Sequence, residues 1–470
     1  MKKNTLVVAV VLLISTQVLF MVPSLVVGEI DEGELREDLT EKNVGLQEKL
    51  FKPEIEGGLD GKADNNGQSY PDTELHAQEN IIASSAFYTR YTRSGNAKAE
   101  DWGEDLFTAL GTIASGGKVE RNEEEGVYYT ADQGMVLEFL SIAYRHSQNQ
   151  EITNLMETTY SSLGDFEANE TVGYSGFPNA YWRAIDSNGN KENPEDEAFK
   201  FCYTNSSLWA IIGMLNFGQE VEDTIIDNDH DYSGTSVTQA KQIIQFCEDY
   251  AFLNGTGFLE YPYANMTDSK KYFHFNTQVL GALAYTRLYQ ATEEQLYLDK
   301  ANMLVEYIIP AYFLDTGEIG GCVSRISVAT GKKSNIKYGY DNALYAYALL
   351  NLYDATNEQT YLQRAEEITR FMNDNLYKVS KDDSIVGYTE RLVEGNVTEE
   401  TLRYWRTNSL MLYVNEEVMW EIRPWYLKYM WFLIIGAIVI LAIIGIIILI
   451  RRRNRIFKKG AEFAEGVLET

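Results

Sequence analysis

Residues 275–292 read FNTQVLGALAYTRLYQAT, and residues 340–356 read YDNALYAYALLNLYDAT. Each segment is followed by a second amphipathic stretch, EEQLYLDKANMLVEYI at 293–308 and NEQTYLQRAEEITRFM at 357–372. Self-similarity at a fixed period, here about 65 residues, is typical of a fold that repeats one supersecondary unit. Because both halves of the unit have helical periodicity, the repeated unit is a helix hairpin.

The same helical periodicity recurs from about residue 74 to residue 420. It predicts first-of-pair helices near residues 76–90, 131–147, 205–217, 276–290, 341–354 and 408–420, and second-of-pair helices near 97–115, 151–163, 236–253, 294–309 and 358–376. The last first-of-pair helix has no evident partner after it. Either a helix at 34–50 closes the ring or the ring is imperfect.

The two sets of helices differ in character. First-of-pair helices are rich in Ala, Leu, Gly and aromatic residues, whereas second-of-pair helices carry Lys, Glu, Gln and Arg on one face. A helix that is apolar around most of its circumference is buried, and a striped helix faces water. The sequence therefore predicts an all-α fold, an (α/α)6 toroid with an inner and an outer ring and short strands at its rim.

A similar joint precedes most first-of-pair helices. Each has aromatic residues followed by Thr, Asn or Asp at the expected N-cap, whose side-chain oxygen would accept a free helix N–H. The joints are VYYTADQ (127–133), FKFCYTNSS (199–207), KYFHFNTQ (271–278), IKYGYDNAL (336–344) and RYWRTNSL (403–410). Gly-aromatic segments at Gly173, Gly257 and Gly387 are expected to edge the same opening as short strands or bends. All of these features would meet at one mouth.

With these features the chain resembles the six-hairpin glycosidase superfamily, over about residues 74–420. The superfamily comprises (α/α)6 glycoside hydrolases, some polysaccharide lyases and sugar epimerases, and the resemblance leaves glucuronyl hydrolases, mannanases and epimerases open. It implies a carbohydrate substrate. Terpene cyclases and prenyltransferases share the toroid, but neither their DxDD motif nor a repeated QW motif is present.

Glycoside cleavage needs one carboxylic acid to protonate the leaving oxygen and one carboxylate as base or nucleophile. Asp132 and Asp341 open two first-of-pair helices, and Glu260 and Glu390 follow two Gly-aromatic segments. These four are the catalytic candidates. The alternative for Asp132 and Asp341 is a helix cap, and the alternative for Glu260 is a solvated strand position.

The candidates are expected to differ in protonation. Tyrosines at 261 and 263 flank Glu260, so Glu260 is the preferred acid. Asp341, or else Asp132, is expected to stay ionised at the positive end of a helix. The side chains expected to bind substrate, by hydrogen bonding, sugar stacking or pairing with a uronic-acid carboxylate, are His274, Trp182, Arg183, Tyr340, Arg325 and Arg391.

No metal or cofactor is predicted. The loop DNDHDYSG at 227–234 begins like a calcium-binding EF-hand, but its Gly is displaced and position 238 is Thr where Glu is required. Cysteine and histidine spacing offers no zinc site, and no phosphate-binding Gly loop is visible. Of the cysteines, Cys202 and Cys247 are expected to form a disulfide, because they lie at the meeting ends of antiparallel helices, which leaves Cys322 unpaired.

The chain ends predict a cell-surface protein. Residues 1–28 resemble a secretory signal, with an uncleaved anchor as the alternative, and residues 29–73 form an acidic, flexible stalk. The toroid is expected at 74–424. Residues 431–450 carry no charge and are long enough to span a bilayer, and the basic tail at 451–470 places the C-terminus inside.

The sequence has a formal net charge of −29, with 69 acidic and 40 basic residues. Such a surface repels nucleic acid, which is therefore excluded as a partner. The expected partners are a carbohydrate and, through one C-terminal helix, the membrane. The favoured function is a membrane-anchored, extracellular carbohydrate-active enzyme, and the alternative is a non-catalytic toroid that binds glycan or protein. Carboxylates that line one cleft would favour the enzyme.

Overall fold

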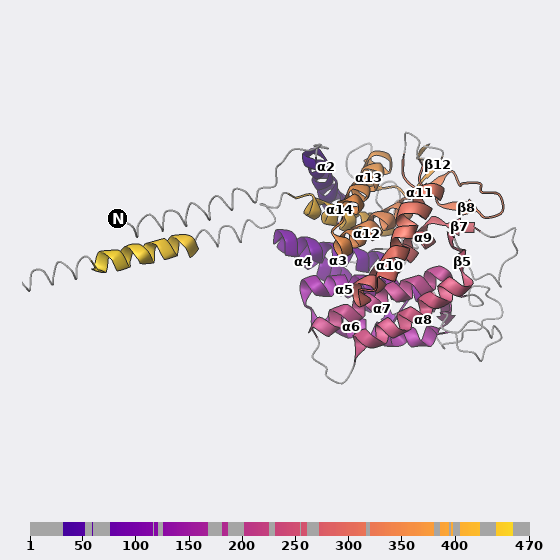
Figure 1. The fold of residues 1–470 in the computed structure, drawn as a ribbon, viewed down its shortest axis with the longest axis horizontal. Coiled ribbons are helices and arrows are strands. Elements are labelled where there is room, and N and C mark those ends of the chain that lie inside the picture. The colour runs from indigo at the N-terminus through magenta and orange to yellow at the C-terminus, as the bar shows by residue number, and fades with distance from the viewer. Residues whose placement is uncertain are drawn as a thin grey trace, which may run out of the picture.

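The computed structural model describes a helical ring and a separate C-terminal helical segment (Figure 1). The described residues are 32–51, 59, 76–115, 117–120, 126–167, 181–186, 202–224, 231–253, 255–260, 272–315, 320–379, 386–393, 396–397, 405–423 and 439–454. The predicted signal segment, the Gly173 segment and most of the basic tail lie outside these residues.

Six helices of the described chain form a closed inner ring, in which each packs on the next and the last returns to the first. They are α3 (Ala77–Ser94), α5 (Thr130–Ser147), α7 (Thr204–Thr224), α9 (Phe275–Thr292), α12 (Gly339–Thr356) and α14 (Trp405–Glu421). Their order around the ring is the order in the sequence, with α14 against α3. The predicted (α/α)6 toroid is confirmed.

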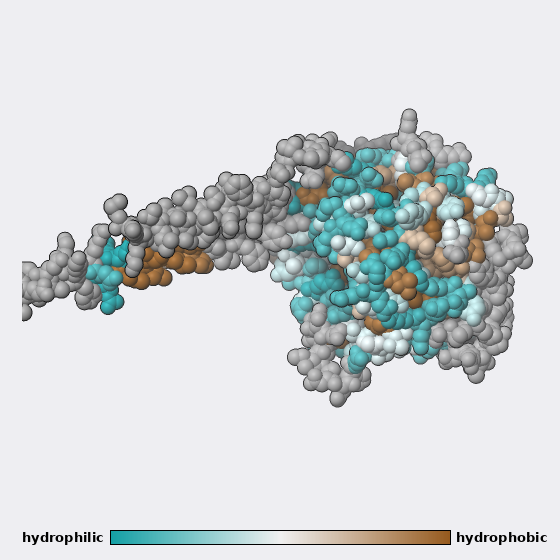
Figure 2. Space-filling model, in the orientation of Figure 1, coloured by the Kyte–Doolittle hydropathy of each residue, from teal (hydrophilic) through white to brown (hydrophobic). Residues whose placement is uncertain are grey.

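The outer ring covers the inner one, with each helix packed on the inner helix that precedes it in the chain. Its members are α4 (Ala97–Thr112), α6 (Gln150–Ser162), α8 (Tyr232–Tyr250), α10 (Gln295–Asn302) and α13 (Gln359–Asn375). Helix α6 runs into the 3-10 turn η3 (Leu163–Phe166), and α10 continues through η7 (Met303–Ile308) into α11 (Ile309–Tyr312). Figure 2 shows that the face in view is mostly hydrophilic with scattered apolar residues.

The sixth outer position is filled from the N-terminal side of the chain. Helix α2 (Glu32–Gly45) and its π-helical continuation η1 (Leu46–Phe51) pack on α14 and bury one apolar face. The Asn43 amide donates to Glu416 at 3.0 Å, and the Phe51 ring lies 5.2 Å from the Trp405 ring. Of the two alternatives for the missing partner, ring closure by this helix is confirmed. Residues 32–51 of the expected stalk therefore belong to the folded domain.

Small residues allow the inner helices to approach closely. Ala282 and Ala346 are fully buried, as their place on first-of-pair helices requires. The closest approach joins α5 and α7, where a Cβ on Gly213 would overlap the backbone carbonyl of Gly134. A Cβ on Gly134 would likewise overlap the backbone of Trp209. Glycine is required at this crossing because any side chain would separate the two backbones.

The axis of the ring also holds a buried ion pair. The guanidinium of Arg287, on α9, and the hydroxyl of Tyr347, on α12, both donate to the Glu138 carboxylate on α5. Glu138 is fully buried and Arg287 is 5 % exposed. A buried carboxylate without a cation would be strongly destabilising, so the pair ties three inner helices together.

Short antiparallel strands lie at the end where the inner helices begin. Three strands lead directly into inner helices: β3 (Val127–Tyr129), β7 (Tyr272–His274) and β9 (Ile336–Tyr338). Each pairs with a later strand: β3 with β4 (Ala184–Asp186), β7 with β8 (Arg325–Ser327) and β9 with β12 (Arg391–Val393). β12 also pairs with β13 (Asn396–Val397). Outer helices end in small hairpins, formed by β1 (Ala114–Ser115) with β2 (Lys118–Val119), β5 (Phe252–Leu253) with β6 (Gly257–Phe258), and β10 (Tyr377–Val379) with β11 (Val386–Tyr388). The expected strands at Gly257 and Gly387 are confirmed.

The fourth residue of most inner helices holds the preceding rim segment in place. Its side-chain amide accepts from the backbone N–H and donates to the backbone C=O of a single rim residue. The pairs are Asn80 with Leu59, Gln133 with Val119, Gln278 with Phe258, Asn342 with Cys322 and Asn408 with Tyr388. We call each pair an amide clamp. The clamps satisfy buried backbone groups that no strand partner reaches.

The expected N-caps are misplaced. The helices capped by Tyr129, His274 and Tyr338 begin after an aromatic residue with extended backbone, and none of these residues makes a side-chain cap hydrogen bond. The Thr, Asn and Asp residues of the joints therefore lie inside the first turn. The reason is that the clamps and strand pairings satisfy the helix entrance, so capping oxygens are not required.

Two other expectations concern the cysteines and the membrane span. Cys202, Cys247 and Cys322 are all buried and unbridged, so the expected Cys202–Cys247 disulfide is absent from this structure. No helix in the described part of the chain combines the length and the apolar composition needed to cross a bilayer. Residues 439–454 are helical, and residues 431–438 of the expected span lie outside the described residues.

Candidate active site

One cavity of about 430 Å³ opens where the inner helices begin. The second residue of every inner helix lines it: Gln78, Ala131, Asn205, Asn276, Tyr340 and Arg406. The sixth residues of four of these helices, Met135, Trp209, Leu280 and Leu344, line it one turn deeper. Residues four apart share a helix face, so the ring presents two layers of side chains to the cavity. This cavity is the predicted mouth.

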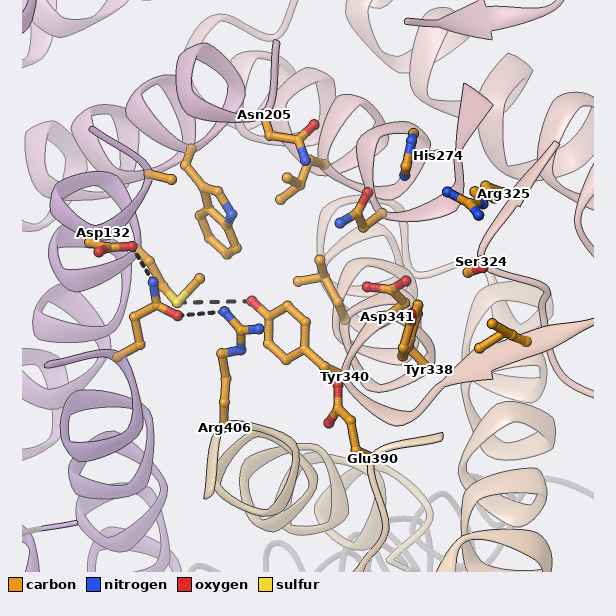
Figure 3. A pocket seen from close by; sticks show the side chains of 18 residues that line it. Asp132, Asn205, His274, Ser324, Arg325, Tyr338, Tyr340, Asp341, Glu390 and Arg406 are labelled. Carbon is orange, nitrogen blue, oxygen red and sulfur yellow. Dashed lines mark hydrogen bonds between the residues drawn. The ribbon is translucent and has the colours of Figure 1, made fainter. Parts of the chain in front are cut away.

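Asp341 lies in the first turn of α12, 8 % exposed, and lines the cavity (Figure 3). Its carboxyl group makes no hydrogen bond with the described residues, so it does not cap its own helix. Its pKa is raised from 3.8 to about 7, chiefly by burial and also by the nearby Glu390 carboxylate, with Arg406 opposing both. The expectation that the helix N-terminus keeps Asp341 ionised therefore fails, because desolvation outweighs the helix dipole.

Glu390 lies beside Asp341 on the rim turn that precedes β12. Its Oε2 accepts a hydrogen bond of 2.7 Å from the Thr407 hydroxyl, in the first turn of α14. Burial raises the pKa of Glu390, while Thr407 and Arg406 lower it. The Glu390 carboxylate in turn raises the pKa of Asp341, so the two groups on this wall of the cavity influence the chemistry of Asp341 together.

A chain of hydrogen bonds fixes Asp132 on the opposite side of the cavity (Figure 3). The Arg406 guanidinium donates to Gln78 Oε1 at 2.8 Å, and Gln78 Nε2 donates to Asp132 Oδ1. A guanidinium can only donate, so Gln78 must present its oxygen to Arg406 and its amide N–H to Asp132. Asp132 is therefore held as an acceptor. Arg406 also lies over the Tyr340 ring, 4.2 Å from its centroid.

Glu260, the expected acid, does not line this cavity. It is a quarter exposed, and its Oε2 lies 3.2 Å from Nε2 of His274. His274 does line the cavity, and burial lowers its pKa, with Glu260 opposing that shift and Arg325 adding to it. The flanking tyrosines at 261 and 263 lie outside the described residues.

The remaining expected binding residues divide between the cavity and its surroundings. Arg325 and Tyr340 line the cavity. Trp182 is 3 % exposed and belongs to the core, so it offers no stacking face. Arg183 lies outside the cavity, 4.5 Å from the Tyr203 ring, and Arg391 is exposed on β12. The structure thus brings together four expected residues in addition to Asp132 and Asp341: Glu390, His274, Tyr340 and Arg325.

Comparison with known proteins agrees with this geometry. The family model described as glycosyl hydrolase family 76 matches residues 237–410. The structure is similar to that of a D-mannose isomerase, with a TM-score of 0.64 and 17 % identity over 84 % of this chain and 99 % of that one. It is also similar to a family 76 α-mannanase of Bacteroides thetaiotaomicron, with a TM-score of 0.61 and 14 % identity over 83 % of this chain and 96 % of that one. The protein is a six-hairpin glycosidase-like toroid.

Sugar epimerases share the same fold. A cellobiose 2-epimerase of Bacillus thermoamylovorans has a TM-score of 0.62 and 13 % identity over 82 % of this chain and 98 % of that one. An uncharacterised protein of Caenorhabditis elegans, B0495.5, is 32 % identical over an alignment of 117 residues that covers 22 % of this chain. The aligned part spans only 15 % of that protein. At these identities the solved structures establish only the toroid fold. The chemistry of this protein has to be inferred from the residues that line its cavity.

Several residues that line the cavity of this six-hairpin toroid were not predicted from the sequence. Gln78, Asn205, Trp209 and Arg406 were not among the candidates, although all four occupy the second or sixth position of an inner helix. The signal was present in the repeat. Once the first residue of each inner helix is known, the residue after it is a lining residue of the cavity.

No metal site is visible among the residues that the structure describes, where no group of three His, Cys, Asp or Glu side chains comes together. The loop with the calcium-like start lies largely outside them. Its last acidic residue, Asp231, caps α8 by accepting from the backbone N–H of Gly234 at 2.8 Å. Helix capping therefore accounts for this aspartate.

Proposed function

We propose that this toroid is a glycoside hydrolase that cleaves mannose-containing glycan outside the cell. The family 76 match and the activity of the similar α-mannanase support the substrate class. Asp132, Asp341 and Glu390 line one cavity, which is the arrangement that favours an enzyme over a purely binding ectodomain.

The observation that carries the proposal is the state of Asp341. A buried carboxyl group that faces a cavity, with no hydrogen-bond partner among the described residues, serves no structural purpose there. With a pKa of about 7 it still holds its proton in much of the population at neutral pH. Such a group is suited to donate that proton to a leaving oxygen.

The mechanism follows from the two sides of the cavity. Asp341 protonates the glycosidic oxygen as the bond from that oxygen to the anomeric carbon breaks. Asp132, held as an acceptor by Gln78, takes a proton from the water that adds to the anomeric carbon. The products are a sugar with a new reducing end and a sugar with a free hydroxyl group. Asp132 then releases its proton to solvent, and Asp341 recovers one from it. Glu390 serves to keep the Asp341 pKa high.

A second candidate function is isomerisation or epimerisation of a free sugar. His274 lines the cavity, and its lowered pKa leaves it neutral and able to accept a proton from a sugar carbon. The similar D-mannose isomerase and cellobiose 2-epimerase are named for such reactions. This candidate requires His274 and predicts no release of reducing ends.

One experiment separates these functions. The full-length protein is incubated with α-mannan oligosaccharides and, separately, with free mannose, and the products are resolved by chromatography. New reducing ends that disappear in Asp341→Asn and persist in His274→Gln support the hydrolase. A ketose or epimer that disappears in His274→Gln supports the isomerase, and sugar binding with no product in either assay favours the non-catalytic alternative.

We also propose that residues 431–450 anchor the protein in a membrane with the toroid outside. The uncharged run and the arginines after it support this orientation. Protease added to intact cells should then release the toroid and leave a membrane-bound fragment that includes residues 431–470. A toroid protected from the protease would contradict the orientation.

A further inference from the structure

We propose that the mouth selects glycans that carry an anionic group, a carboxylate or a phosphate, and that Arg325 binds this group. The inference rests on the proposed function of the mouth as a glycan site and specifies its substrate class. It begins from a contrast between arginines at the mouth and arginines elsewhere in the ring.

Arginines on the inner helices away from the mouth each have a carboxylate partner. Arg90 pairs with Glu416 and Arg93 with Glu417, both at 2.8 Å, and the other two pairs are Arg145 with Glu220 and Arg287 with Glu138. In a chain with 69 acidic and 40 basic residues, a nearby carboxylate is easy to supply. An ion pair with a carboxylate is therefore the ordinary state of an arginine on an inner helix away from the mouth.

Arg325, on the rim strand β8, differs from these arginines. It lines the cavity, and its guanidinium lies over the Tyr272 ring at 5.0 Å, with no carboxylate partner among the described residues. Arg183, outside the cavity, shows the same arrangement, with its guanidinium 4.5 Å from the Tyr203 ring and a 3.2 Å hydrogen bond to the Tyr203 hydroxyl. Both side chains have neutral aromatic partners.

This arrangement prepares Arg325 for an anion. Stacking occupies the face of a guanidinium and leaves the N–H groups at its edge free, in the fork geometry that matches carboxylate or phosphate. His274, the cross-strand neighbour of Arg325, already engages Glu260 at 3.2 Å. The Glu260 carboxylate is thereby directed to His274, and among the described residues no carboxylate forms an ion pair with Arg325.

The cavity can accept a further negative charge despite its own carboxyl groups. Asp341 holds its proton up to about pH 7, and Asp132 is compensated by the hydrogen-bond chain from Arg406. The N-termini of the inner helices also converge on the cavity, and each contributes a partial positive charge. Glu390 also lines the cavity, where it accepts from the Thr407 hydroxyl and where the positive charges of Arg406 and Arg391 lower its pKa. An anionic glycan therefore meets a mouth in which positive groups offset part of the negative charge.

Binding measurements on full-length protein in detergent test the proposal. The Asp341→Asn variant serves as background, so that no probe is consumed. The probes are mannobiose, a mannobiose carrying a 6-phosphate and a mannose–glucuronate disaccharide. We expect at least one anionic probe to bind at least about tenfold more tightly than mannobiose, and the preference to weaken with salt. The anionic probe that binds identifies whether phosphate or carboxylate is the natural group.

Variants of Arg325 complete the test. Arg325→Gln should abolish the preference, so that the anionic probe binds no more tightly than mannobiose, and an unchanged melting temperature should report that the variant is folded. Arg325→Lys should retain part of it, because charge remains and the fork is lost. Lys98→Gln, an equal change of charge on exposed α4, should have no effect. Equal binding of all probes, or an unaltered preference in Arg325→Gln, would overturn the proposal.

The outcome is separable from that of the proposed function. Cleavage of neutral mannan by a protein with no anionic preference would leave the hydrolase standing and reject this inference. Selective binding of an anionic probe by a protein that cleaves nothing would support the inference and reject the hydrolase.

Discussion

Asp341 and Glu260 show how far the surroundings of a carboxyl group decide its chemistry. Both follow an aromatic residue or precede one in the sequence, and both were candidates for the same reaction. In the fold, Asp341 faces a cavity without a hydrogen-bond partner, whereas Glu260 lies outside that cavity beside His274. We therefore assign the proposed acid role to Asp341, because of the two carboxyl groups only that of Asp341 lines the cavity.

The raised pKa of Asp341 makes folding stability depend on pH. Its folded-state pKa of about 7 lies above its ordinary 3.8, so between these values the folded protein holds a proton that the unfolded chain has lost. The stabilisation is complete below pH 4 and is lost as the pH rises through 7, at up to about 1.4 kcal/mol per pH unit. Asp341→Asn should remove this slope. Urea unfolding at several pH values should show the variant gaining stability over wild type from pH 4 to 8, and parallel curves would contradict the assignment.

Glu390 provides a second test at this scale. Replacing it with Gln removes a negative neighbour, so the Asp341 pKa should fall. In a pH–rate profile of glycan cleavage, the alkaline limb of Glu390→Gln should move to lower pH by a measurable fraction of a unit. A matched change at exposed Glu358→Gln on the outer ring should leave the limb in place. An unmoved limb in Glu390→Gln would show that Asp341 is not the titrating acid.

At the scale of the element, the amide clamp is the recurring device that joins each inner helix to its rim. Asn408 accepts from the Tyr388 N–H at 2.7 Å and donates to the Tyr388 carbonyl at 3.2 Å. Asn408→Ala should leave two buried backbone groups without partners and cost roughly 2 to 4 kcal/mol of unfolding free energy. Ser207 occupies the same position of α7, and its hydroxyl holds no backbone group of the described residues in a clamp. Ser207→Ala, measured in the same denaturant series, should therefore cost under about 1 kcal/mol, and equal costs would contradict the clamp.

The crossing of α5 and α7 gives a second prediction for the elements. Gly213→Ala places a methyl group against the Gly134 carbonyl, so the helices must separate or the backbone must shift, at about 3 kcal/mol or more. Gly111, on outer helix α4, has open space around its Cβ position. Gly111→Ala should be neutral or gain up to about 1 kcal/mol through helix propensity. Thermal unfolding of both variants checks the contrast, and a harmless Gly213→Ala would mean that α5 and α7 lie further apart.

Helix periodicity predicted the inner and outer rings because the two kinds of helix differ in composition. The buried inner helices are apolar around most of their circumference, whereas the outer helices carry charged residues on one face. The rim could not be predicted in the same detail. Thr, Asn and Asp were assigned to N-caps by their type, yet Asn342 and Asn408 serve as clamps to residues 20 positions earlier. The aromatic residues Tyr129 and Tyr338 occupy the caps instead. Cap preferences describe isolated helix ends, and here neighbouring segments satisfy the same backbone groups.

At the scale of the whole molecule, the ring closes by joining the two ends of the domain. Helix α2 and η1 pack on α14, and Arg90 on α3 shares Glu416 of α14 with Asn43 of α2. Phe51, fully buried, contacts the rings of Phe87 and Trp405 at 5.7 and 5.2 Å. The closure is therefore part of the hydrophobic core.

A pair of substitutions tests whether residues 32–51 are structural. Phe51→Ala should cost about 3 to 5 kcal/mol, because it opens a cavity between α3 and α14. Val44→Ala, on the same segment but 44 % exposed, should change stability by less than about 0.5 kcal/mol. If Phe51→Ala unfolded at the wild-type denaturant concentration, residues 32–51 would be a loose extension as the sequence first indicated.

The meeting of α2 with α14 means that the ring has no obligatory starting point. Each hairpin contacts the hairpins before and after it, and the last contacts the first, so the order of contacts is circular although the polypeptide is linear. A circularly permuted chain, opened at an exposed turn such as that between α12 and α13, would retain every helix neighbour. The position in the ring at which the chain begins and ends is thus set by where the polypeptide is opened, and evolution or design can change it without rebuilding the site.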